Sequence, residues 1–315
     1  MTEDTATEDT AADWGDYLTV PEAASFLRIS PRKVYDLVSR SGLPHHRAGG
    51  RLLFERSRLA DWVRGNGLDH GMPAPPLVLA GSHDALLDWA VRASHAALAT
   101  LCRGSRDGLE RVQRREACAA LLHLPAPAAA RGRDGFNVDA VARVLDRQDV
   151  VLINWCWRQQ GLMIAPDNPH GIGSLDDLIV GTRDGGLRVG RRSAGAGSRE
   201  LFDRLIEELA MASGDEPGIN IALDELDSEN DAAMAVRLGQ VDAVFGAQSA
   251  AQSIGVGFVP LVRERVDLLI NRRSYFEPPL QVLLDFCRTP SFAAHAQALG
   301  GYDLAEHGTV IWNGE

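Results

Sequence analysis

The sequence predicts a protein of two domains: a small, mostly helical N-terminal domain and a larger α/β domain in two lobes. The chain has 315 residues, which is more than one typical core requires. A segment rich in Gly and Pro, residues 65–76, interrupts the periodic pattern as an interdomain linker would. Beyond this linker, short apolar runs alternate with helical patterns, which is typical of α/β folds.

The composition is that of a globular protein, with 45% hydrophobic and 24% charged residues. No apolar run approaches the ~20 residues that span a bilayer. Residues 1–16 are acidic, whereas a secretory signal starts basic and continues apolar, so we expect a disordered tail and a cytoplasmic protein. The four cysteines form no C-x-x-C pair, and the sequence therefore predicts no zinc site and no redox motif.

Charge is unevenly distributed along the chain. The net charge is -11, which on its own argues against nucleic-acid binding. Residues 17–64, however, contain nine basic and four acidic side chains and lie between an acidic tail and an acidic remainder. Positive charge is thus concentrated in one segment, as contact with a phosphate backbone requires.

This basic segment contains two closely spaced helix starts. Thr19 and Glu22 have the spacing of a capping box, and Ser30 followed by Pro31 gives a second start signal. In the second helix, apolar residues recur with a helical period, so that Arg32 and Lys33 face outward at its N-terminal end. Two short helices joined by so few residues predict a helix-turn-helix, whose second helix usually enters the major groove N-terminus first.

A hairpin and a third helix complete the segment. Gly49 and Gly50 separate two short runs, as in a two-residue hairpin turn, and Arg47 and Arg51 flank the turn as a basic wing. Ser57 is predicted to cap a last short helix that closes the core.

The segment resembles the excisionase-like winged helix-turn-helix domains related to the MerR regulators. The resemblance is carried by L-T-V-P-E-A-A at 18–24, G-L-P at 42–44 and the closing run from Phe54 to Trp62. It implies contact with double-stranded DNA through the second helix and the wing. The residues in those positions are Arg32, Lys33, Tyr35, Arg47 and Arg51. A helical domain with solvated arginines, or one that binds protein, is the alternative interpretation.

The predicted domains are thus a winged helix-turn-helix at 17–64, a linker at 65–76 and an α/β domain at 77–315. In the α/β domain, a strand at Leu77–Ala80 leads into a helix that begins near Asp84. Further helices are predicted near 106–115, 138–145, 174–179, 198–211, 229–238, 247–254, 278–288 and 291–299. Further strands are predicted near 118–123, 150–157, 162–165, 187–191, 219–222, 241–245, 257–261 and 266–270. The alternation predicts parallel sheets in two lobes.

Three turns of this domain place Gly and Ser before a helix, at residues 81–84, 104–108 and 192–198. Backbone amides and hydroxyls at a helix N-terminus form an anion site. The third turn is not a dinucleotide fingerprint, because Glu200 stands where the third glycine is needed. A P-loop is also absent from the sequence, whose only lysine is Lys33.

The larger domain resembles the bacterial PBP-like domain, which is similar to type II periplasmic binding proteins, especially those for molybdate and tungstate. The resemblance is carried by G-S-H-D at 81–84, V-V-L-I-N at 150–154, the motif at 235–246 and L-G-G-Y-D at 299–303. It implies two lobes that close on a ligand. The positions that match the oxyanion site are Ser82, Ser105, Ser193, Gly195 and Ser198. Arg191, Arg192 and Arg199 depart from this neutral set, and an inward arginine would favour a carboxylate, phosphate or pterin-bound oxyanion.

The resemblances together imply a one-component transcriptional regulator that is not an enzyme, needs no cofactor and senses molybdate or tungstate. Because winged domains usually read paired half-sites, we also expect a homodimer. The alternatives are a regulator for another small anion or for a ligand related to the molybdenum cofactor, an excisionase-like DNA-architecture factor, and an enzyme built on the two-lobed fold.

Overall fold

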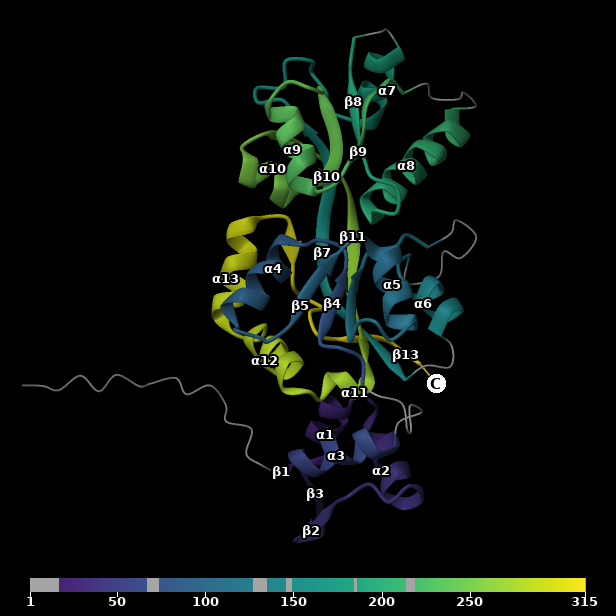
Figure 1. Ribbon diagram of the computed structural model, residues 1–315, viewed down its shortest axis with the longest axis vertical. Coiled ribbons are helices and arrows are strands. Elements are labelled where there is room, and N and C mark those ends of the chain that lie inside the picture. The colour runs from purple at the N-terminus through teal and green to yellow at the C-terminus, as the bar shows by residue number, and fades with distance from the viewer. Residues whose placement is uncertain are drawn as a thin grey trace, which may run out of the picture. The chain divides into compact units, whose positions relative to one another are not determined.

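The computed structural model describes residues 17–66, 74–126, 135–145, 149–183, 186–213 and 219–314. The chain forms two compact units, Met1–His70 and Gly71–Glu315, which are drawn in Figure 1. The predicted acidic tail and residues 67–73 of the predicted linker lie outside the described residues. Among the described residues, no helix is both long enough and apolar enough to cross a membrane.

The first unit is a helix-turn-helix with a three-stranded sheet. Its helices are α1 (Val20–Leu27), α2 (Pro31–Arg40) and α3 (Arg56–Asn66), and its strands are β1 (Tyr17–Leu18), β2 (His46–Ala48) and β3 (Arg51–Glu55). The predicted capping box is present, because the backbone N–H and the hydroxyl of Thr19 both donate to Glu22 at 2.7 Å. The Ser30 hydroxyl accepts from the backbone N–H of Lys33 and so caps α2.

The wing is an antiparallel hairpin in which His46 pairs with Leu53 and Ala48 pairs with Arg51. Gly49 and Gly50 have φ of 55° and 79°, the left-handed conformation that a two-residue turn of this type demands. Strand β1 adds to the other side of β3, and it was not predicted because a two-residue strand has no recognisable pattern. Helix α3 begins at Arg56, not after a Ser57 cap, because the Ser57 hydroxyl donates to Glu55 instead.

The second unit is the predicted α/β fold. Its strands are β4 (Val78–Gly81), β5 (Ala99–Cys102), β6 (Ala119–Leu122), β7 (Val150–Ile164), β8 (Val189–Arg192), β9 (Ile221–Leu226), β10 (Ala243–Ala247), β11 (Gly257–Asn271), β12 (Tyr302–Asp303) and β13 (Val310–Asn313). Its helices are α4 (Ala85–Ala93), α5 (Ser105–Gln113), α6 (Val138–Leu145), α7 (Leu175–Arg183), α8 (Gly197–Ser213), α9 (Glu229–Arg237), α10 (Gln248–Ile254), α11 (Arg272–Tyr275), α12 (Pro278–Phe286) and α13 (Pro290–Leu299).

Two long strands connect the two lobes. The sheet has the order β5-β4-β6-β11-β7-β10-β8-β9, and both β7 and β11 run the length of the unit (Figure 1). The first lobe contains β4–β6, α4–α6 and α11–α13, and the second contains β8–β10 and α7–α10. The sequence predicted four short strands here and was wrong. Arg158 and Glu264 break the apolar pattern, but they are buried and pair with each other inside two continuous strands.

The prediction of parallel sheets holds only for the outer strands. Strand β4 is parallel to β5 and β6, and β8 is parallel to β9 and β10. The central pair β7–β11 is antiparallel, and so are β6–β11 and β7–β10. Each lobe is therefore a parallel α/β unit built onto a shared antiparallel ribbon.

The sheet of the second lobe is buried on both faces. Along β7, Leu162 and Ile164 pack with α7 and α8, whereas Met163 between them packs with α9 and α10. Strand side chains alternate between faces, so both faces must be apolar. This explains why these strands appear in the sequence as continuous apolar runs.

Candidate functional site

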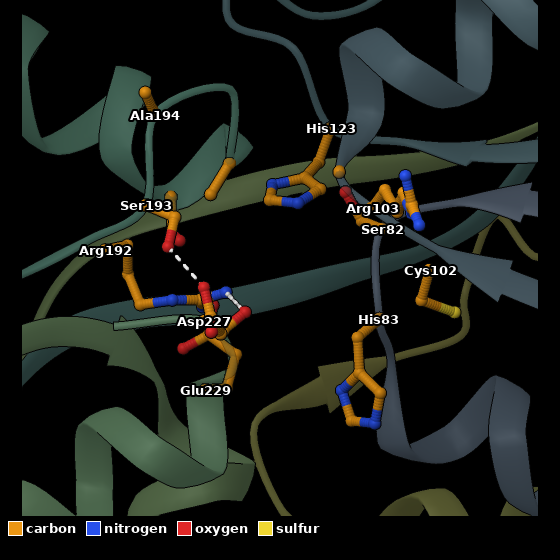
Figure 2. Close-up of a pocket in the computed structure, with 13 residues that line it drawn as sticks. Ser82, His83, Cys102, Arg103, His123, Arg192, Ser193, Ala194, Asp227 and Glu229 are labelled. Carbon is orange, nitrogen blue, oxygen red and sulfur yellow. Dashed lines mark hydrogen bonds and ion pairs between the residues drawn. The ribbon is translucent and has the colours of Figure 1, made fainter. Parts of the chain in front are cut away.

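A cavity of about 310 Å³ lies between the two lobes of the second unit. Residues of both lobes line it, as Figure 2 shows. The first lobe contributes Ser82, His83, Cys102, Arg103, Gly104 and His123. The second lobe contributes Arg192, Ser193, Ala194, Ala196, Ser198, Asp227 and Glu229. All three Gly/Ser turns identified in the sequence therefore reach this cavity.

Ser82 and Ser105 lie together in the first lobe. Their hydroxyl oxygens are 2.8 Å apart, and Ser105 also accepts from the backbone N–H of His123. Ser82 lines the cavity, whereas Ser105 is fully buried and does not. The sequence predicted Ser105 as a direct ligand residue, but it does not line the cavity and reaches it through its hydrogen bond with Ser82.

The second lobe presents the start of α8. Ser198 is 1% exposed and lines the cavity, yet its hydroxyl oxygen has no hydrogen-bond partner among the described residues. Ser193 also lines the cavity, and its hydroxyl donates to Asp227 at 2.9 Å. Gly195 is not a lining residue. Its carbonyl oxygen would lie only 2.7 Å from a Cβ on Gly104, which shows that the lobes approach closely there.

One of the three noted arginines points inward. Arg192 lines the cavity, but its Nε and Nη2 donate to the carbonyl oxygens of Leu226 and Asp227, and its Nη1 pairs with Glu229 at 2.8 Å. Burial opposes ionisation of Glu229, but the charges of Arg192 and Arg158 hold its pKa below the ordinary value. Glu229 is therefore a carboxylate, and the guanidinium of Arg192 is already neutralised by protein groups.

Arg191 and Arg199 are not lining residues. Arg191 forms a two-bond pair with Asp224, and Arg199 pairs with Asp203 and Asp224. Arg103 is different, because it lines the cavity and its side chain makes no hydrogen bond or ion pair within the described part of the chain. Arg103 is thus a lining cation whose charge none of the described residues neutralises.

The lining residues that the sequence analysis missed as site residues include Arg103, His123, Asp227 and Glu229. Arg103 directly precedes the second Gly/Ser turn, which was the only available signal. His83 was not named as a site residue either. It lines the cavity, and its hydrogen bond with Asp88, partly opposed by burial, raises its pKa.

The predicted DNA-contacting residues lie on α2 and the wing of the first unit. Arg32, Lys33 and Tyr35 are exposed on α2, and Arg47 and Arg51 are exposed on β2 and β3. The four basic side chains form no hydrogen bond or ion pair with any described residue. Their charges are therefore available to a partner.

Comparisons with known families match both units. The helix-turn-helix domain family matches residues 17–67, and the PBP superfamily domain matches residues 89–288. The chain belongs to the PBP superfamily. A helix-turn-helix domain is thus fused to a PBP domain, and neither of the two families is a catalytic one.

Individual proteins resemble this chain in sequence or in fold. The uncharacterized protein YvgK of Bacillus subtilis is 26% identical over 311 residues, covering 93% of this chain and 97% of that protein. A Clostridium perfringens protein assigned to phosphate ABC transporter substrate-binding proteins, solved with bound phosphate, aligns with a TM-score of 0.51 at 10% identity. That alignment covers 72% of this chain and 98% of the other.

A buried polar network lies beneath the cavity of the PBP domain. Arg158 on β7 donates to Glu264 at 2.7 Å and to Asp84 at 3.0 Å, while Nδ1 of His123 is 3.0 Å from Glu264. Burial opposes ionisation of Glu264, but the charges of Arg158 and His123 and the hydrogen bonds of His123 and Gln160 hold its pKa at about 2. The network joins both connecting strands to the first lobe.

The described residues show no reactive thiol or metal cluster at this site. Burial raises the pKa of the Cys102 thiol to about 11, so the thiol stays protonated at neutral pH. Within the described ranges, no group of three or more His, Cys, Asp or Glu side chains is arranged to hold a metal ion.

Proposed function

We propose that this chain is a one-component DNA-binding transcriptional regulator whose PBP domain senses a small anion. In this proposal the DNA-binding domain is residues 17–64 and the ligand-sensing domain is residues 77–315. The observation that carries the proposal is the buried hydroxyl of Ser198, which lines the cavity between the lobes and has no hydrogen-bond partner in the described part of the chain. A buried polar group without a hydrogen bond is costly, so a bound ligand that accepts this hydrogen bond would be stabilised.

Several features favour an anion as this ligand. The starts of α5 and α8 lie at the cavity, and the first amides of a helix have no partner within it. Ser82 and Ser193 add hydroxyl groups, and Arg103 adds a cation. Molybdate and tungstate remain our first candidates. Phosphate and carboxylates are included because two arginines line the cavity and the C. perfringens relative holds phosphate.

Calorimetric titration of the full chain with molybdate, tungstate, sulfate and phosphate tests the anion class. We expect saturable binding of at least one anion, and Ser198→Ala should weaken it roughly tenfold to hundredfold, as for a hydrogen bond to a charged group. Ser94→Ala, which removes a hydroxyl at the end of α4, is the matched control. Absence of heat and of thermal stabilisation with all four anions would overturn the anion class.

Regulation requires that anion binding changes DNA binding. Only a ligand that distinguishes between two states of the protein can shift its DNA affinity. We expect the affinity for the DNA upstream of the protein's own gene, measured by fluorescence anisotropy, to change when the anion is added. A chain lacking residues 65–315 should not respond. An excisionase-like architectural factor would instead bind DNA equally with and without the anion.

We also propose a homodimer, because one small winged domain contacts little DNA. Light scattering after size-exclusion chromatography gives the mass directly. The protein mass should be twice the 34.1 kDa of one chain, either in the free protein or in its DNA complex once the mass of the DNA is subtracted. A protein mass of one chain under both conditions would overturn the dimer.

A further inference from the structure

His123 lies where the cavity, the second lobe and the connecting strands meet. It follows β6 of the first lobe and is 4% exposed. Its ring packs against Gly197 of the second lobe so closely that a Cβ there would be 2.5 Å from Nδ1. Figure 2 shows the ring between Ser193 on one side and Ser82 on the other.

The two ring nitrogens have different surroundings. Nδ1 lies 3.0 Å from the carboxylate of Glu264, which is ionised and can only accept, so Nδ1 carries a hydrogen. Nε2 has no hydrogen-bond partner among the described residues, although His123 lines the cavity. The ring thus has one nitrogen engaged by the protein and the other open to whatever occupies the cavity.

We propose that His123 is a direct anion ligand of the PBP domain, with Nδ1–H donating to Glu264 and Nε2–H donating to an oxygen of the anion. This inference rests on the proposed function. A ring that donates from both nitrogens is an imidazolium, so a neutral His123 takes up one proton from solvent when the anion binds. The anion, the imidazolium and Glu264 then alternate in charge.

The same ring links the anion to the strands that join the lobes. Glu264 lies on β11 and also accepts from Arg158 and Gln160 of β7. An anion bound to Nε2 is therefore two hydrogen bonds away from β11 and three from β7. This gives the closed arrangement a contact that an empty cavity lacks, which is the differential affinity that closure requires.

The charged groups that face His123 define how the proposal is tested. Glu264 and Arg158 lie beneath the ring, and Arg103, Arg192, Asp227 and Glu229 line the cavity around it. Of the lining residues, His83 is the other histidine, and it is engaged by Asp88. The pH dependence of anion binding must therefore be compared between chains that differ only at His123.

Two substitutions distinguish the roles of the two nitrogens of the His123 ring. His123→Asn keeps a donor near the position of Nδ1 and removes the cavity-facing group, whereas His123→Gln places its amide nitrogen near the position of Nε2. Sulfate and molybdate are titrated into each full-length chain at about pH 6.5 and about pH 8.5, where both stay dianions. Thermal melts of each variant report whether the fold is intact.

We expect His123→Asn to weaken binding roughly tenfold to hundredfold at the lower pH, and His123→Gln to bind more tightly than His123→Asn. Binding to the unmodified chain should weaken as pH rises, and both variants should lose this dependence. Equal affinity of folded His123→Asn and the unmodified chain would overturn the role of His123 alone. A pH dependence that persists in both variants would assign the proton to His83 and overturn the imidazolium. No binding to the unmodified chain would overturn the proposed function together with this inference.

Discussion

Glu264 shows how single residues determine both stability and site geometry in this protein. It is fully buried and accepts hydrogen bonds from Arg158 and Gln160, with His123 at 3.0 Å. Removing one member of a buried ion pair leaves the other charge without compensation. Glu264→Ala should therefore lower the free energy of unfolding by about 3–5 kcal/mol in a denaturant titration. Glu116→Ala, which removes the partially exposed partner of Arg111, is the control and should change it by about 1 kcal/mol or less.

The same carboxylate predicts a dependence of stability on pH. Its pKa is about 2 in the folded protein, below the ordinary value of 4.5. The stabilisation from Glu264 is therefore complete above pH 4.5 and is lost as the pH falls toward about 2. Melting temperatures measured across this range should fall less steeply for Glu264→Gln than for the unmodified chain. Parallel curves would show that other carboxyl groups dominate the acid response.

Among single residues, the sequence analysis identified the polar turns but not their partners. Ser82, Ser193 and Ser198 were found because hydroxyls before a helix have a recognisable pattern, and all three line the cavity. His123 and Glu264 are separated by more than a hundred residues and are brought together by strand pairing. Such pairs carry no local signal, because each residue alone resembles a surface position.

At the element scale, the prediction worked where periodicity and capping agree. The first unit was predicted with its two helix starts and its hairpin turn, since caps and paired glycines act locally. Strands β7 and β11 were each divided in two, because a buried polar cluster interrupts a pattern that otherwise marks a buried strand. The connecting ribbon of the PBP domain is thus the element that local reasoning describes least well.

The exposed basic side chains of α2 and the wing predict how DNA affinity depends on salt. Each phosphate contact releases bound counterions, so losing one contact reduces the slope of log K against log salt by about 0.9. We expect Arg51→Ala to weaken binding to all sequences alike and to reduce the slope by this amount. Arg114→Ala removes an exposed arginine of α5 and serves as the control. An unchanged slope for Arg51→Ala would remove the wing from the DNA interface.

At the scale of the PBP domain, the two lobes touch through side chains as well as through the connecting strands. Arg106 of α5 and Glu200 of α8 form a two-bond ion pair across the cleft, at 2.5 and 2.9 Å. Arg204 of α8 donates to the carbonyl oxygen of Ala126 and lies over the ring of Phe136. These contacts exist only when the lobes are close together, so they stabilise the closed arrangement.

The Arg106–Glu200 pair should contribute measurably to the affinity of the PBP domain for its anion. For a ligand that binds only the closed arrangement, the apparent affinity is the intrinsic affinity multiplied by the fraction of molecules that are closed. Because the pair is partly exposed, it should contribute about 0.2–1 kcal/mol. We therefore expect Arg106→Ala and Glu200→Ala each to weaken anion binding by up to roughly fivefold, and the double variant to be no weaker than either. The Glu110–Arg114 pair lies within α5 and does not cross the cleft, so its double-alanine variant should bind normally. Tighter binding after loss of the Arg106–Glu200 pair would mean that this pair holds the cavity shut against its ligand, and would reverse its assigned role.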